Sequence, residues 1–253
     1  MRTHISSLVV AAALGITAQQ AAAVVTFAFA DNPDPNGQFL YEAPNANHPA
    51  SGILAYNSAV TIDLAIDATG EGGNEYEYTD ATFEFLATVG EFVETQTAGI
   101  YLAPLTSGVF SFSAADNARA GDLLMTGSFG TANNPAYLVI VVDTGSINVS
   151  ALVGGLVITP TDRLLGDLSE PSLGNISTEV IGFSAPFDSV WTLSNMSNLS
   201  TRYINNGQAR GVFLEDFIAN SSYSGTAGRV VPSPASAALA GLGLAFAGLR
   251  RKR

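Results

Sequence analysis

Carboxylates supply almost all of the reactive side chains in this 253-residue chain. The sequence has 22 Asp and Glu residues, two histidines and no cysteine, which excludes thiol catalysis and cysteine-ligated metals. His48 is the one histidine beyond the first 23 residues, and we expect it to be solvated in its proline-rich loop. A Gly-x-Ser-x-Gly elbow, which would present a nucleophilic serine, does not occur.

Glycoside hydrolysis would need only two carboxyl groups, one of them with a raised pKa. The sequence does not single out such a pair, because its glutamates recur as they would on the solvated face of strands. The residues in question are Glu75, Glu77, Glu84, Glu91 and Glu94. We therefore predict no catalytic residues and no enzymatic activity.

Two acidic loops could hold calcium through oxygen ligands. Residues 32–37 (NPDPNG), within the turn-rich loop 31–47, partly match the start of a calcium-binding loop. The match departs at its first position, Asn32, and at its twelfth, Ala43, with Glu42 one residue early. Residues 67–75 (DATGEGGNE) form the second acidic loop. Calcium binding is possible at both loops, but we assign no ligands, no metal site and no other cofactor.

Three stretches show how these side chains are positioned. Residues 61–67 (TIDLAID) alternate apolar and polar side chains, which is typical of a half-buried antiparallel strand. Residues 75–86 also alternate, but the apolar parity changes near Thr79 and Asp80, which predicts a bulge or bend. Residues 137–142 (YLVIVV) do not alternate, so we predict a strand buried on both faces.

Shorter segments complete a predominantly β prediction. Apolar runs bounded by turn residues predict strands at 24–30, 99–103, 109–114, 123–129 and 152–159. Asn206-Gly207 predicts a type I′ hairpin. Residues 162–168 could form a single helical turn, 213–219 favour a strand, and we expect 225–229 to be a flexible stem.

These elements predict one all-β domain, an antiparallel β-sandwich of jelly-roll-like type, over residues 24–228. A domain of this length can be held together by burial alone, without disulfides. Its predicted core consists of Ile62, Leu64, Ile66, Phe110, Phe112 and the strand 137–142.

The charge of the chain is unevenly distributed. Residues 24–231 hold five arginines, no lysine and all 22 acidic residues, a formal charge of −17. Such a body is repelled by nucleic acid and by anionic membrane surfaces, so we exclude nucleic acid as a partner. Cations and neutral glycans are easier partners. The alternative is that the acidity only keeps an extracellular protein soluble.

The end of the chain has three parts. Val231-Pro232-Ser233-Pro234 favours an extended backbone, residues 235–249 carry no formal charge, and Arg250-Arg251-Lys252-Arg253 ends the sequence. Fifteen residues rise about 22 Å as a helix, which is short of a roughly 30 Å hydrocarbon core. Basic residues can snorkel and a thin bilayer can accept a short helix, so we predict a transmembrane helix with a cytoplasmic basic end. A buried C-terminal core helix is the alternative, but Ser236 alone cannot supply a polar face.

The N-terminus predicts export. A weakly basic start with Arg2 precedes the apolar run 8–16, and Ala21 and Ala23 occupy the −3 and −1 positions of a cleavage site. The run is too short to span a membrane, so we predict a signal peptide over residues 1–23, with cleavage after Ala18 as the second option. A buried N-terminal helix is the remaining alternative.

Together the two ends resemble those of bacterial PEP-CTERM proteins. The resemblance is carried by the signal peptide, by Val231-Pro232-Ser233-Pro234, by the apolar run 235–249 and by the basic residues 250–253. Ser233 stands where the family usually has Glu, and the resemblance covers under a fifth of the chain. It implies export through the inner membrane and cutting by an exosortase-like enzyme. It also implies a destination at the cell surface or in extracellular polysaccharide. The sorting segment is 229–253, and within it we predict that residues 235–249 span the membrane transiently.

Three function classes are compatible with the sequence. The first is a non-enzymatic protein of the bacterial surface or extracellular matrix, associated with exopolysaccharide, and this is our prediction. The second is a carbohydrate-binding jelly-roll module, which would need an open groove with aromatic platforms. The third is a secreted glycoside-acting enzyme, which would need two carboxyl groups about 5 to 10 Å apart in a cleft.

Overall fold

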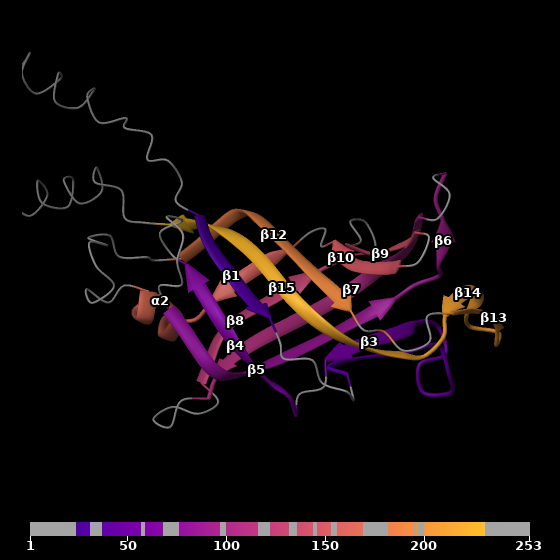
Figure 1. Cartoon of the computed structure of the whole chain (residues 1–253), viewed down its shortest axis with the longest axis horizontal. Helices are drawn as coiled ribbons and strands as arrows, with labels where there is room; N and C mark the ends of the chain where they lie inside the picture. Colours follow the sequence, from indigo (N-terminus) through magenta and orange to yellow (C-terminus); the bar gives the residue numbers. More distant parts are fainter. Residues whose placement is uncertain are drawn as a thin grey trace, which may run out of the picture.

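A computed structural model gives the architecture of the central part of the chain. The residues it describes are 24–30, 37–56, 59–67, 76–96, 100–115, 122–131, 136–143, 146–152, 156–168, 182–194, 196 and 200–230. Within these ranges almost every element is an antiparallel strand, which confirms the all-β prediction. Figure 1 shows long twisted strands along the main axis, with the one helix of the described residues, α2 (Asp162–Leu168), at one end and the β13–β14 hairpin at the other.

The strands of the first half are β1 (Val24–Ala30), β2 (Phe39–Glu42), β3 (Gly52–Tyr56), β4 (Thr61–Asp67), β5 (Tyr76–Val89), β6 (Val93–Glu94), β7 (Ile100–Ala114) and β8 (Asp122–Phe129). Those of the second half are β9 (Ala136–Asp143), β10 (Ser146–Leu152), β11 (Val157–Pro160), β12 (Gly182–Ser194), β13 (Thr201–Asn205), β14 (Arg210–Leu214) and β15 (Phe217–Val230).

Two long strands organise the sheet by changing partners along their length. β5 pairs with β4 through its first half and with β3 through its second, while its other edge pairs with β7. β15 pairs with β2 and then β1 on one edge and with β12 on the other. The pairings run from β1 through β4, β5, β7, β9, β10, β12 and β15 back to β1. The hydrogen-bonded ladder therefore closes on itself around one core.

Aromatic side chains fill that core. The Trp191 ring on β12 lies 5.3 Å from those of Phe85 on β5 and Phe110 on β7, although β12 pairs with neither strand. Tyr223 on β15 lies 4.9 Å from Trp191 and 5.7 Å from Phe112. Because these rings meet across the interior, the sheet packs as two facing layers, as the sandwich prediction requires.

Several sequence predictions are confirmed. The predicted core residues of 61–67 are at most 2% exposed, and Phe110 and Phe112 at most 3%. Residues 24–30 and 162–168 form β1 and α2 with the expected bounds. The predicted parity change is a bulge in β5, because Ile62 pairs with Ala81 and Leu64 with Tyr78. Asp80, at the bulge, has a φ of 56°.

Other predictions were wrong. Tyr137 is 37% exposed while Leu138 and Ile140 are buried, so the described part of 137–142 faces the core on one side only. The periodicity was hidden because Val139, half-buried on the other face with Tyr137, is also apolar. The predicted stem 225–229 is part of β15, where small side chains pack against neighbouring strands. A further strand, β2, lies inside the predicted loop 31–47.

Turn chemistry and proline caused two smaller errors. The 206–209 hairpin forms, but only Gly207 has a positive φ there, so the turn is not type I′. The strands predicted at 99–103 and 109–114 form one strand, β7. Pro104 does not end this strand, because it lies beside the register shift between Thr88 and Val89, where a proline is tolerated. The strand predicted at 213–219 is split between β14 and β15.

Both ends of the chain lie outside the described residues. This applies to the predicted cleavage positions Ala21 and Ala23, to Val231, Pro232, Ser233 and Pro234, and to Arg250, Arg251, Lys252 and Arg253. Over the part of the chain that the structure describes, no helix has the length and apolar character needed to cross a membrane.

Candidate functional site

Four of the five glutamates predicted to be solvated are confirmed as exposed. Glu77, Glu84, Glu91 and Glu94 are all exposed, and Glu75 lies outside the described residues. Among the residues that the structure describes, no three Asp, Glu or His side chains gather as a metal site would require. Most of both calcium candidates, 32–37 and 67–75, is not described, so the calcium prediction stays a prediction.

His48 is held by hydrogen bonds and is not simply solvated as predicted. Its Nε2 lies 2.9 Å from Glu42 Oε2 and 3.0 Å from Asn45 Nδ2, and its Nδ1 lies 3.1 Å from the Ser51 carbonyl oxygen. Burial lowers the pKa of His48, but the bonds to Glu42 and Ser51 outweigh it and raise that pKa above its ordinary value. The imidazole therefore joins β2 to the loop before β3.

Three of the tyrosines lie in the core. Tyr41, Tyr56 and Tyr78 are at most 6% exposed. Burial raises the pKa of Tyr41 and Tyr78 above the ordinary tyrosine range, and the bond from Tyr78 to Asp167 adds to the effect. The phenols of Tyr41 and Tyr78 stay protonated near neutral pH, and none of the three rings offers an exposed face to a ligand.

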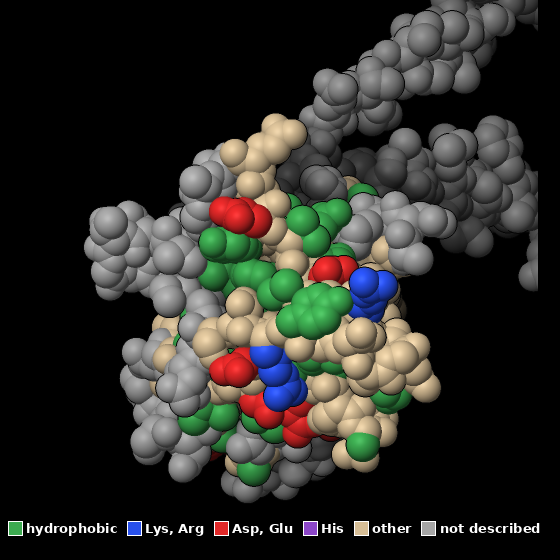
Figure 2. All heavy atoms as spheres, turned by 90° about the vertical axis from the view of Figure 1, so that its right-hand side faces the viewer, with side chains coloured by type: hydrophobic (Ala, Val, Ile, Leu, Met, Phe, Trp, Pro, Cys, Tyr) green, Lys and Arg blue, Asp and Glu red, His purple; other side chains and the backbone are tan. Residues whose placement is uncertain are grey.

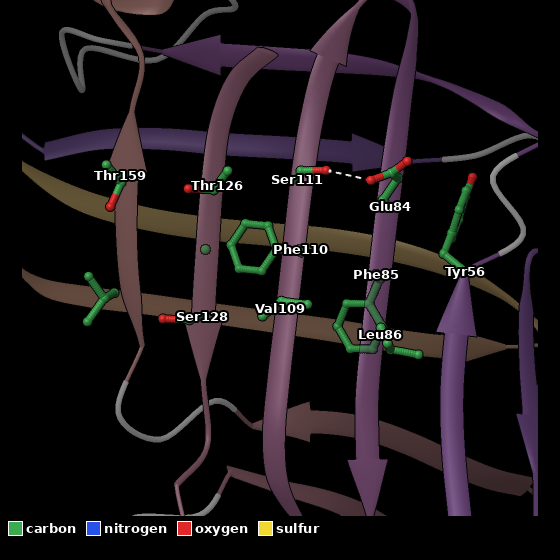
Figure 3. A pocket seen from close by; sticks show the side chains of 12 residues that line it. Tyr56, Glu84, Phe85, Leu86, Val109, Phe110, Ser111, Thr126, Ser128 and Thr159 are labelled. Atoms are coloured by element: carbon green, nitrogen blue, oxygen red, sulfur yellow. Dashed lines mark hydrogen bonds between the residues drawn. The ribbon is translucent and has the colours of Figure 1, made fainter. Parts of the chain in front are cut away.

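A groove of about 630 Å³ lies on the outer face of β5, β7, β8 and β11 (Figure 3). Side chains from these four strands line it in two parallel rows that follow the strand register. The first row is polar and consists of Glu84, Ser111, Thr126 and Thr159. The second row is mostly aliphatic and consists of Leu86, Val109, Ser128 and Val157.

The groove is nearly free of charge. Glu84 is the one charged side chain among its lining residues, and its Oε2 accepts a hydrogen bond of 3.2 Å from Ser111 Oγ. Ser111, Thr126 and Thr159 each carry a hydroxyl that can donate and accept. The site has no basic group to bind an anion and no second carboxyl group for the two-carboxylate chemistry of glycosidases.

Tight packing beneath the groove fixes its floor. Gly127 lies between Thr126 and Ser128, and a Cβ at that position would stand 2.0 Å from Cζ of Phe110. The Phe110 ring therefore occupies the space that a side chain at 127 would take. A rigid floor holds the outward side chains of β7 and β8 in a fixed order.

Strand alternation predicted that Glu84 points outward, but not which residues lie beside it. The parity of Phe83 and Phe85 implies that Glu84 and Leu86 face the opposite side. Their neighbours Ser111 and Val109 depend on the pairing of β5 with β7, which a single sequence does not reveal. The groove was missed for that reason.

The end of the molecule that carries the hairpin has a different surface. Figure 2 shows basic, acidic and hydrophobic side chains mixed over this end. Arg202 and Arg210 of the hairpin are exposed there, as is Tyr203 at 61%. Such a mixed surface is typical of a solvated face.

Comparisons with known proteins do not extend the assignment. No family model matches the chain, and no curated protein and no solved structure is significantly similar to it.

Proposed function

We propose that this chain is an exported bacterial protein of the cell surface or extracellular matrix, sorted through its C-terminal segment 229–253. One observation carries the proposal: the order of Pro232-Ser233-Pro234, the uncharged run 235–249 and four terminal cations. The prolines keep a cutting site extended, the short apolar helix holds it at the outer membrane face, and the charges stay in the cytoplasm. An exosortase-like enzyme then cuts near the prolines.

The body is proposed to be non-enzymatic and to have the jelly-roll-like arrangement of a sandwich. The pairing of β1 with β15, the first and last described strands, supports that arrangement. The lone carboxylate of the groove and the tethered His48 support a role other than catalysis. With its signal peptide 1–23 removed, such a body is delivered outside the cell, where exopolysaccharide is the available polymer.

Mass spectrometry of the protein recovered at the cell surface tests the sorting proposal. We expect a mature C-terminus near Pro232–Pro234, and recovery of chain ending at Arg253 would overturn the proposal. Replacing Pro232 and Pro234 together with Ala should leave the protein membrane-bound and uncut. Ser236→Ala is the matched control, because it changes the same tail without touching the prolines or the charges, and it should be cut normally. Deleting 250–253 should impair retention.

Carbohydrate binding is the second candidate function, favoured by the groove. The groove has the size of small-ligand sites, which span about 300 to 1,000 Å³. The exposed aromatic platforms expected for this class are not among its lining residues. Aliphatic side chains occupy the corresponding surface.

A further inference from the structure

An exposed aliphatic stripe crosses six neighbouring strands of the outer face. The register aligns one outward residue from each of β2, β3, β5, β7, β8 and β11. In order these residues are Leu40, Ala55, Leu86, Val109, Ser128 and Val157. Neighbouring strands lie about 4.8 Å apart, so the stripe extends for about 24 Å.

The stripe is unusually open to solvent. Leu86, Val109 and Val157 are 50–54% exposed, and Leu40 is 42% exposed. Large aliphatic side chains exposed singly are ordinary, but four of them aligned in one row, with Ala55 and Ser128 between them, mark an interaction site. A polar row runs parallel to the stripe, two residues away along each strand, and consists of Glu84, Ser111, Thr126 and Thr159.

We propose that this surface binds a neutral, linear polysaccharide, laid across the strands along the two rows. Pyranose rings present C–H groups on their faces and hydroxyls around their edges, which fits an aliphatic row beside a hydroxyl row. Hydroxyl side chains can donate to and accept from sugar hydroxyls, and Glu84 can accept two such bonds. The inference rests on the proposed extracellular location and names the ligand class of the groove.

Charge selects a neutral glycan over an anionic one. The groove offers one carboxylate and no cation, within a body of formal charge −17. An anionic polysaccharide would be repelled by the body and would find no ion-pair partner in the site.

Two other occupants fit the surface less well. An extended peptide gains most of its affinity by adding a strand to a sheet edge, but the groove lies on a sheet face where backbone groups are already paired. A second copy of this chain would bring another charge of −17 against the first, and a hollowed face does not match itself. We therefore make self-association an outcome of the test.

Titration calorimetry of the purified full chain with neutral linear hexasaccharides (gluco-, manno- and galacto-) tests the proposal. A hexasaccharide of uronic acids is the anionic probe. We expect at least one neutral oligosaccharide to bind and the uronic acid probe not to bind. Val109→Asp places a charge in the stripe and should weaken binding at least about tenfold. Glu84→Gln, which keeps the shape but loses the anionic acceptor, should weaken it by about three- to tenfold.

Val93→Asp is the matched control, because Val93 on β6 is 56% exposed, like Val109, but does not line the groove. It should leave binding within about twofold. Absence of binding by every neutral probe, or equal losses in Val93→Asp and Val109→Asp, would overturn the proposal. So would sedimentation showing a dimer that Val109→Asp dissociates, since a second copy would then occupy the stripe. Binding by the purified chain does not depend on cutting of the tail, so the binding proposal and the sorting proposal can be overturned independently.

Discussion

The two faces of β7 differ in what they do, although their residues alternate along a single strand. Phe110 points inward, is 3% exposed, and contacts rings from β8, β12 and β15. Val109, the preceding residue, points outward and is 54% exposed. The inner face is fixed by aromatic packing from both layers, whereas on the outer face Val109 stands in solvent and Ser111 bonds to Glu84 of the neighbouring strand.

This difference separates stability from recognition. Side chains on the inner face are held by many contacts, so changing them alters the free energy of unfolding. Side chains on the outer face already stand in water, and changing them alters mainly what the surface can bind. Each face can therefore be changed with little effect on the other.

The largest effect is expected from Phe110→Ala. Removing a buried phenylalanine ring costs about 3 to 5 kcal/mol of unfolding free energy, through lost burial and the cavity left beside Trp191 and Phe129. Denaturant unfolding followed by Trp191 fluorescence measures the loss. Val109→Ala, one residue earlier, should change stability by less than about 1 kcal/mol. Similar losses for the two variants would contradict the assignment of the faces.

The fold was largely predictable, because the alternation of apolar and polar residues along a strand indicates which side chains face the core. Ile62, Leu64 and Ile66 were identified as core residues, and the parity change near Asp80 identified the bulge. The 225–229 segment was missed, because glycine and alanine carry a strand there only through contacts with β1 and β12. Local composition cannot show that such a strand lies at the centre of a sheet.

The second prediction concerns Gly127→Ala. Gly127 lies on β8 against the inward-facing ring of Phe110, between the outward-facing Thr126 and Ser128. A Cβ at this position would stand 2.0 Å from Phe110 Cζ, so the ring must move within a packed core. We expect a loss of about 1 to 3 kcal/mol of unfolding free energy. Denaturant unfolding of the single variants and of the double variant Gly127→Ala/Phe110→Ala gives the coupling. The double variant should lose less than the sum, because the clash disappears with the ring; strict additivity would argue against this contact.

The candidate site was less predictable than the fold, because it depends on pairing between distant strands. Glu84 and Thr159 are 75 positions apart in the sequence and share a row only because β7 and β8 lie between β5 and β11. No short motif marks such a row. The sequence indicated only which residues of each strand face outward, and not which strands lie side by side.

The third prediction tests the bulge that sets the parity of β5. Asp80 holds a φ of 56°, its N–H donates to Asp63 Oδ1 at 3.1 Å, and its carboxylate accepts from Thr61 Oγ1 at 3.3 Å. Asp80→Ala should cost about 1 to 2 kcal/mol of unfolding free energy, because alanine tolerates positive φ poorly. Thermal unfolding at fixed pH measures it. Asp80→Asn and Asp80→Gly should cost less, since both residues accept this conformation; the reverse order would contradict the strain argument.

The smallest expected effect is a pH dependence from His48, on the loop between β2 and β3. The pKa of His48 is raised in the folded protein, so folding favours the protonated imidazole. The stabilisation is fully present below the unfolded pKa of about 6.5 and is lost as the pH rises through the folded value. Because Glu42 is 45% exposed, we expect a contribution of only about 0.2 to 1 kcal/mol.

Thermal unfolding of the parent chain and of Glu42→Gln between pH 5 and 8.5 isolates this contribution. The melting temperature of the parent should fall relative to that of Glu42→Gln as the pH rises past about 6.5, because only the parent has an anion beside the imidazolium. High salt should shrink the difference, since the pair is partly exposed. Glu94→Gln is the matched control, because Glu94 is an exposed glutamate on β6 that pairs with no described cation. A difference of the same size in Glu94→Gln would show that overall charge, and not the pair with His48, sets the pH dependence.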